Sequence, residues 1–309
     1  MTDLQSKFWD SFIEAFESKK FMKAIPQINS LSTTSVMLNM FFENEPLAKG
    51  TGWFWRLSNG IALVTAWHNF SGLHHTDRTT LSSKAGMPDR IRFRYVAKEP
   101  LTFQETEVPL YLDEDRTQPR WYVHSECGSF FDMAFLGLEL NGGDVTCIND
   151  AVSIQPDGSS KPGQDVFAIG YPQAVATMGV FPIWKRGSIA SEPDTLVDGH
   201  PKFFVDMAGR GGLSGAPVFC FQRGTVINPT TSGQEIGFGE KTEFLGLYSG
   251  RVADQLPADA RSGESTDLGF VWRSDVVIEM LNNGVLDEKP EVGKGKQIIK
   301  PIWRKEDFA

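Results

Sequence analysis

Short apolar runs separated by turn residues fill most of the chain between residues 35 and 272. The clearest runs are residues 36–42, 61–65, 166–172, 218–221 and 244–250. Apolar runs of four to eight residues bounded by Gly, Pro, Asn or Asp are typical of β-strands. Asn59-Gly60, which lies between two such runs, is a strong hairpin signal. The pattern predicts an all-β protein, built as a sandwich or as a pair of barrels.

One helix is predicted at each end of this β-rich region. In residues 3–23 an apolar side chain recurs every four positions, at Leu4, Phe8, Phe12 and Phe16. That spacing is typical of one face of a helix, and such a face must be buried. We expect it to pack on the rest of the chain, or to dock a partner or a second protomer. The second helix covers residues 274–281, with Ser274 as its N-cap.

These patterns divide the chain into four parts. Residues 1–30 are predicted to be a helical extension, and residues 31–145 a first β-unit. Residues 146–285 are predicted to form a second β-unit with the C-terminal helix, and residues 286–309, rich in Lys and Glu, a tail.

Composition excludes several classes of function. A formal charge of −9 argues against sequence-independent nucleic-acid binding, which needs a basic surface. No apolar run has membrane-spanning length, and the charged first 23 residues lack the apolar centre of a signal peptide. Three cysteines are too few and odd in number for a disulfide framework. We therefore expect a cytoplasmic protein. We expect no metal or cofactor, because His124 and Cys127 are spaced like only half of a metal site.

The strongest chemical signal is the glycine-rich stretch that runs from Gly209 to Phe219, with Ser214 at its centre. Glycine adopts backbone angles that other residues resist, so a tight loop is expected directly before the serine. Such a loop can aim backbone N–H groups at one point, as an oxyanion hole requires. A serine hydroxyl needs a base, and that base needs an orienting acid. The alternative is a flexible surface turn.

His68 and Asp132 are the candidates for that base and that acid. His68 follows the buried run 61–65, whereas the other four histidines lie in polar loops where solvated side chains are expected. Asp132 interrupts the apolar run 130–138, and a buried carboxylate needs a hydrogen-bonding partner. A structural histidine and a backbone-bound aspartate are the alternatives. The chain order His, Asp, Ser is that of the chymotrypsin fold.

Three short motifs carry a family resemblance. Thr65-Ala66-Trp67-His68, Asp132-Met133-Ala134-Phe135-Leu136 and Gly212-Leu213-Ser214-Gly215-Ala216-Pro217 resemble the corresponding motifs of trypsin-like serine peptidases. The resemblance covers residues 35–283 and is nearer the bacterial branch that includes HtrA-type and glutamyl endopeptidases. It implies two six-stranded antiparallel β-barrels, the first carrying His68 and Asp132 and the second Ser214, with the cleft between them.

The resemblance also implies a role for each residue. Ser214 would attack a peptide carbonyl, His68 would move the proton, and Asp132 would hold the imidazole. The N–H groups of Gly212 and Ser214 would form the oxyanion hole. A protein or peptide substrate would pair as an added strand beside Tyr248, Ser249 and Gly250.

Departures from the family pattern bear on activation and specificity. Leu213 replaces the acid that precedes the serine in the animal enzymes, so activation through that acid is not expected. Ala208 stands where trypsin carries its specificity acid, which argues against cleavage after Lys or Arg. We expect cleavage after a small or apolar substrate residue instead, unless Arg210 and Arg251 select an acidic substrate residue.

Three functions remain open from the sequence. The first is a serine endopeptidase, which retention of all three motifs favours. The second is a catalytically silent trypsin-like fold used as a protein-binding module. The third is acyl transfer or ester hydrolysis by the same three residues.

Overall fold

A computed structural model describes residues 28–82, 86–98, 102–140, 144–152, 154, 160–230, 233–252 and 267–293, without the side chains of residues 222–238. The chain divides into two compact units, Met1–Ser30 and Leu31–Ala309, and the description below concerns the second. The helix predicted for residues 3–23 and the end of the predicted tail lie outside the described residues.

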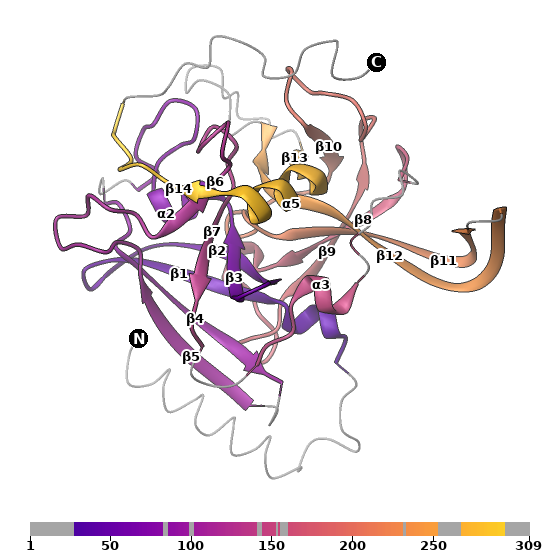
Figure 1. Ribbon diagram of the computed structural model, residues 1–309, viewed down its shortest axis with the longest axis horizontal. Helices are drawn as coiled ribbons and strands as arrows, with labels where there is room; N and C mark the ends of the chain where they lie inside the picture. Colours follow the sequence, from indigo (N-terminus) through magenta and orange to yellow (C-terminus); the bar gives the residue numbers. More distant parts are fainter. Residues whose placement is uncertain are drawn as a thin grey trace. The chain divides into compact units, whose positions relative to one another are not determined.

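The first half of the second unit is an eight-stranded sheet in which neighbouring strands are antiparallel (Figure 1). The strand order is β14-β6-β7-β3-β2-β1-β4-β5. Its strands are β1 (Ser35–Phe42), β2 (Glu45–Leu57), β3 (Gly60–Thr65), β4 (Arg90–Ala97), β5 (Thr102–Pro109), β6 (Trp121–Val123), β7 (Ala134–Leu138) and β14 (Val285–Leu286). The β2–β3 hairpin turns at Asn59-Gly60, as the sequence predicts.

The second half is a closed barrel with the strand order β10-β13-β12-β11-β8-β9. Its strands are β8 (Asp165–Gly170), β9 (Ile183–Ile189), β10 (Lys202–Asp206), β11 (Pro217–Thr230), β12 (Gly233–Arg251) and β13 (Leu268–Arg273). Strands β11 and β12 continue past the barrel as a long two-stranded hairpin (Figure 1).

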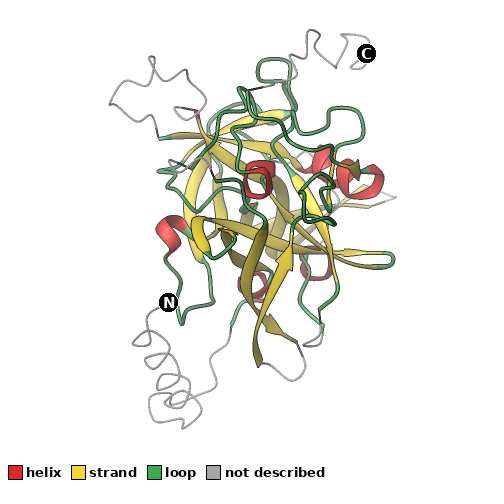
Figure 2. Cartoon of the chain, turned by 90° about the vertical axis from the view of Figure 1, so that its left-hand side faces the viewer, coloured by secondary structure: helices red, strands yellow, loops and turns green. Residues whose placement is uncertain are grey.

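Helices are few and short (Figure 2). They are η1 (Ser30–Thr33), α2 (Trp67–Ser71), α3 (Ile148–Ala151), η2 (Pro172–Ala174) and α5 (Ser274–Asn283). The predicted helix at 274–281 is α5, but its N-cap is Arg273, because Ser274 already lies inside the helix. None of the helices in the described ranges is both long and apolar enough to cross a membrane.

The all-β prediction is confirmed, and the two halves are consistent with a chymotrypsin-like double barrel. The first half differs in detail from the expected six-stranded barrel, since it is an eight-stranded sheet. One of its extra strands, β14, comes from beyond helix α5 and pairs with β6. Residues 285 and 286 thus belong to this sheet.

Both halves contribute to one apolar cluster that joins them. Trp53 and Phe131 from the first half and Phe219 and Trp272 from the second are all buried in it. Burying side chains of this size stabilises a fold by roughly 1.5–3 kcal/mol each. The joint core thus fixes the loops at the junction of the two halves, and these loops carry the candidate site.

Candidate active site

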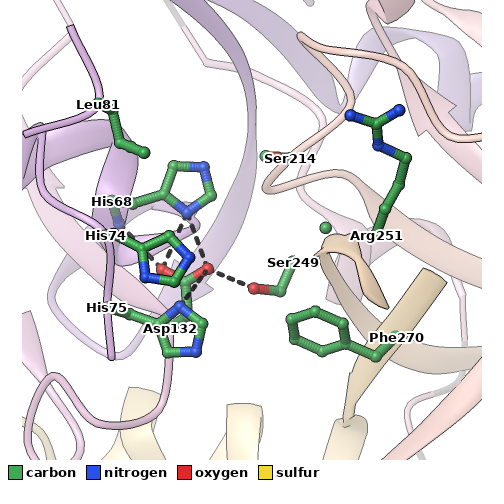
Figure 3. Close-up of a pocket in the computed structure, with 10 residues that line it drawn as sticks. His68, His74, His75, Leu81, Asp132, Ser214, Ser249, Arg251 and Phe270 are labelled. Carbon is green, nitrogen blue, oxygen red and sulfur yellow. Dashed lines mark hydrogen bonds and ion pairs between the residues drawn. The ribbon is translucent and has the colours of Figure 1, made fainter. Parts of the chain in front are cut away.

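A cavity of about 150 Å³ brings together residues from both halves (Figure 3). Its lining is His68, His74, His75, Leu81, Asp132, Ser214, Ser249, Gly250, Arg251 and Phe270. Six residues that the sequence singles out for the site are among them, namely His68, Asp132, Ser214, Ser249, Gly250 and Arg251. Gly212, Ala208 and Tyr248 are not part of this lining. In the described part of the chain no cluster of His, Cys, Asp or Glu could hold a metal ion.

His68 lies on the one-turn helix α2, directly after strand β3. The helix ends at Gly72, which has a φ of 71° and donates its N–H to the carbonyl of His68 at 2.9 Å. A side chain at this position would be strained by the positive φ and would clash with Pro88. The short helix leaves the His68 imidazole partly exposed at the cavity.

Asp132 is buried just before strand β7 and holds His68 at two points. Its Oδ2 lies 2.8 Å from Nδ1 of the imidazole, and its Oδ1 accepts the backbone N–H of His68 at 3.0 Å. The hydroxyl of Ser249 donates a further hydrogen bond to Oδ2 (Figure 3). A carboxylate at Nδ1 favours the tautomer with the proton on Nδ1, which leaves Nε2 as the acceptor.

The environment keeps Asp132 ionised. Burial alone would raise its pKa, but the charge and hydrogen bond of His68, helped by the hydrogen bond of Ser249, hold the pKa of Asp132 well below its ordinary value. The site therefore contains a fixed carboxylate that stabilises positive charge on the imidazole.

The Ser214 loop depends on two glycines. Gly212 and Gly215 have φ values of 92° and 90°, in the region that disfavours other residues. A Cβ on Gly212 would stand 2.4 Å from the carbonyl oxygen of Tyr171, and one on Gly215 would stand 2.2 Å from that of Thr51. Both positions therefore require glycine, and together they produce the sharp turn that carries Ser214.

Amide groups in this loop alternate in their hydrogen bonding. The N–H groups of Leu213, Gly215 and Ala216 donate to backbone carbonyls at 2.8–3.2 Å. Within the described residues, those of Gly212 and Ser214 donate to no backbone carbonyl. Two amides one residue apart thus remain available for an anionic oxygen.

Three buried polar residues of the first half hold the loop through its backbone. Thr51 donates its N–H to the carbonyl of Ser214 at 3.0 Å and its hydroxyl to the carbonyl of Gly212 at 2.7 Å. Asn69 donates to the Ser214 carbonyl at 3.0 Å and to the Thr65 hydroxyl at 2.8 Å. The Thr65 hydroxyl in turn donates to the Thr51 carbonyl at 2.6 Å. Sequence reasoning names Thr65 only as part of the motif before His68 and misses Thr51 and Asn69, although a threonine between Gly50 and Gly52 in an apolar strand is an unusual pattern.

The Ser214 hydroxyl itself forms no hydrogen bond to any described residue. In Figure 3 the His68 imidazole lies between Asp132 and Ser214. Catalytic hydrogen bonds are often long before a substrate binds and tighten in the complex, so the absence of this bond is compatible with a nucleophilic role for Ser214.

The solvated state predicted for the other histidines is wrong for His75 and His124, which are both buried. His75 stacks on His74, and its Nδ1 lies 4.0 Å from Oδ2 of Asp132. Burial lowers the pKa of His75 to about 4, although the charge of Asp132 opposes this. His75 is thus neutral near pH 7 and forms a wall of the cavity. Because the loop around His75 is polar, the sequence predicts that it is exposed, whereas in the structure His75 is buried beside the cavity.

The residues proposed to bind substrate have different environments. Tyr248 is buried, and its ring fills the space beside Gly209 and Gly269, where a Cβ would overlap it. The hydroxyl of Ser249 is directed to Asp132. Pairing between β11 and β12 begins at Pro217 and Leu247, so among the described strands only β13 pairs with Gly250 and Arg251. Among the described strands, none pairs with the other edge of β12 at Gly250.

A two-halved β-fold with a His–Asp pair beside a serine loop defines the class of trypsin-like serine peptidases. Residues 50–227 match the trypsin-like peptidase domain family. This match covers more than half of the chain, and the chain belongs to that family.

Solved structures similar to this chain include several proteases. The HtrA-type protease AlgW with tripeptide is 16% identical, with a TM-score of 0.48, and the match covers 81% of this chain and 60% of AlgW. The serine endoprotease from Yersinia pestis is 12% identical (TM-score 0.45; 84% and 67% covered). The protease Anisep from Arthrobacter nicotinovorans is 14% identical (TM-score 0.45; 81% and 94% covered). This chain thus spans less than two thirds of AlgW. A comparison with curated proteins gave no match.

Proposed function

We propose that the chain is a serine endopeptidase in which Ser214 is the nucleophile, His68 the general base and Asp132 the orienting acid. The observation that carries the proposal is the Asp132–His68 hydrogen bond of 2.8 Å in a cavity that Ser214 also lines. Membership of a peptidase family supports hydrolysis of a protein or peptide substrate.

The proposed reaction uses these groups in two stages. Nε2 of His68 takes the hydroxyl proton as Ser214 Oγ attacks the scissile carbonyl, and then donates that proton to the leaving amine. A water molecule next attacks the acyl-enzyme, with His68 again accepting a proton and returning it to Ser214. Asp132 holds Nδ1–H throughout and stabilises the imidazolium.

The oxyanion of each tetrahedral intermediate would accept hydrogen bonds from the amides of Gly212 and Ser214. Their lack of a backbone acceptor within the described residues supports this role, whereas the neighbouring amides are already committed. Donors that are preset before the reaction stabilise the developing charge without reorganisation.

An extended substrate would pair with the edge of β12 at Gly250 that no described strand occupies, as an added β-strand. The hydrogen bond between Ser249 and Asp132 supports two separate roles for this strand. The Ser249 side chain would bind Asp132, and the neighbouring backbone would bind substrate. A peptide library distinguishes the two side-chain preferences: a small or apolar residue, or an acidic one selected by Arg210 and Arg251.

A cytoplasmic location is part of the proposal. All three cysteines are unpaired and buried, which supports a reducing compartment. We also propose that residues 3–23 dock a partner or a second protomer. Comparing the oligomeric state of the protein with and without residues 1–27 tests the second of these.

A fluorophosphonate probe tests the proposed enzyme directly. We expect the wild type to be labelled once, at Ser214, and Ser214→Ala to remain unlabelled. An unlabelled wild type that still binds peptides would favour the silent binding module. If the wild type is labelled, matched amide and ester substrates separate a peptidase from an esterase, and turnover of the ester alone would contradict the proposal.

A further inference from the structure

The segment after helix α5 returns to the first half of the fold. Strand β14 pairs with β6, and the N–H of Asp287 donates to the carbonyl of Trp121 at 3.0 Å. Further along, the N–H of Gly293 donates to the carbonyl of Arg78 at 3.0 Å. Residues 285–293 are therefore bound to two separate parts of the sheet and its loops.

The carboxylate of Asp287 is largely enclosed and accepts two indole hydrogen bonds. Its Oδ2 lies 2.7 Å from Nε1 of Trp67 and 2.9 Å from Nε1 of Trp121. Both tryptophans are fully buried. Burial raises the pKa of Asp287, and the two indole N–H groups act in the opposite direction. Enclosing a carboxylate is costly unless it is paired in this way.

Arg78 lies over the ring face of Trp67. Its guanidinium is 4.1 Å from the centre of the indole ring and donates to the Ser129 hydroxyl at 2.8 Å. Arg78 belongs to the loop that supplies His74, His75 and Leu81 to the cavity. Trp67 is thus held at its N–H by Asp287 and on its ring face by Arg78.

Trp67 is the residue directly before His68 and the first residue of α2. A helix of five residues has few internal hydrogen bonds, so its orientation depends on its side-chain anchors. Productive geometry in an active site tolerates displacements of only about 0.5 Å. The contacts that Asp287 and Arg78 make with Trp67 therefore affect the orientation of the His68 imidazole.

We propose that Asp287 is a positioning residue, which fixes helix α2 through the Trp67 indole and thereby orients His68 toward Ser214. This inference rests on the proposed peptidase function. It assigns the segment after α5 a task in the site, although Asp287 touches neither substrate nor the reacting atoms.

Two substitutions of Asp287 distinguish a role of its hydrogen bonds to the tryptophans from a role of its negative charge. Asp287→Asn keeps a carbonyl oxygen for both indoles, and we expect its kcat to stay within about threefold of wild type. Asp287→Ala removes the acceptor. Because a displacement of about 1 Å costs on the order of 100-fold, we expect kcat to fall by about 10- to 100-fold. KM should change by less than about threefold, since the substrate strand edge is untouched.

The test measures kcat, KM and the rate of fluorophosphonate labelling per folded molecule, with circular dichroism giving the folded fraction. Trp67→Phe, which keeps an aromatic ring at this position but loses the N–H donor, is the second variant and should also lower kcat. Glu114→Gln, at an exposed position, is the control for charge removal. Wild-type kcat in both Asp287→Ala and Trp67→Phe would overturn the inference. So would a loss carried by KM alone. A wild type that is never labelled would instead refute the proposed function.

Discussion

The two sides of the cavity are held in different ways. On one side, Asp132 receives hydrogen bonds from the ring and backbone of His68 and from the Ser249 hydroxyl. On the other side, Ser214 is fixed only through its backbone, and its hydroxyl bonds to no described residue. Side-chain hydrogen bonds thus hold His68 and Asp132 in position, whereas Ser214 is held in position by the backbone of its loop.

The first half of the fold contributes to both sides. His68 and Asp132 belong to it directly, and Thr51 and Asn69 reach from it to the carbonyl of Ser214. The barrel supplies Ser214 and bonds to its loop through Tyr248, and the sheet adds the hydrogen bonds of Thr51 and Asn69. Substitutions on the His68–Asp132 side and substitutions at the Ser214 loop should therefore reduce activity by different amounts.

Removing the acid–base pair should produce the largest loss. We expect His68→Ala to lower kcat by on the order of 10⁴- to 10⁶-fold and Asp132→Asn by about 10⁴-fold, because both leave Ser214 without a correctly oriented base. Steady-state hydrolysis of an amide substrate measures both. Retention of more than a tenth of wild-type kcat in either variant would show that the base is elsewhere.

Releasing the Ser214 loop should have the next largest effect. Thr51→Val removes the hydroxyl that binds the Gly212 carbonyl, and we expect kcat to fall by about 10- to 100-fold. The buried carbonyl loses a donor, so the free energy of unfolding should drop by roughly 1–3 kcal/mol. Thr51→Ser keeps the hydroxyl and is the matched control. Equal activities of the Val and Ser variants would mean that the contact does not position the loop.

Removing the third donor to Asp132 should weaken the acid–base side only slightly. In Ser249→Ala the carboxylate keeps both hydrogen bonds to His68, so we expect kcat to fall by about three- to tenfold. Ser249→Thr retains a hydroxyl and should recover most of the activity. A change in KM without a change in kcat would instead assign the Ser249 side chain to substrate binding.

His75 should affect stability rather than kcat. Its pKa is about 4 in the fold and about 6.5 when unfolded, so the unfolded state binds more protons between these values. Its contribution, on the order of 3 kcal/mol, is present above pH 6.5 and is lost as pH falls toward 4. Urea unfolding of wild type and His75→Gln across pH 4–7 measures this. Parallel curves for the two proteins would show that His75 is not the titrating group, despite the nearby Asp132, His74, His68 and Lys202.

The sequence locates the central residues because each is conspicuous locally. His68 follows a buried strand, Asp132 interrupts an apolar run, and Ser214 lies among glycines. Their supports are not conspicuous. Thr51 meets Gly212 across 161 positions, Asn69 meets Ser214 across 145, and Ser249 meets Asp132 across 117. Such pairs arise from the packing of the two halves, and no local pattern predicts them.

The fold shows the same division. Strand alternation and turn residues predict the all-β class and the hairpin at Asn59-Gly60. Strand β14 has only two residues, too few for a periodic signal, and its pairing with β6 depends on the return of the chain after α5. The charged stretch after residue 286 therefore suggests a tail, although Asp287 is anchored between two buried tryptophans.

The central claim, that Asp132 acts through His68 on Ser214, is tested most directly by a double-variant cycle on kcat. We expect Asp132→Asn to cost about 10⁴-fold in the wild-type background and less than about threefold in the His68→Ala background, because residues that act as one unit are not additive. A similar large loss from Asp132→Asn in both backgrounds would contradict the claim.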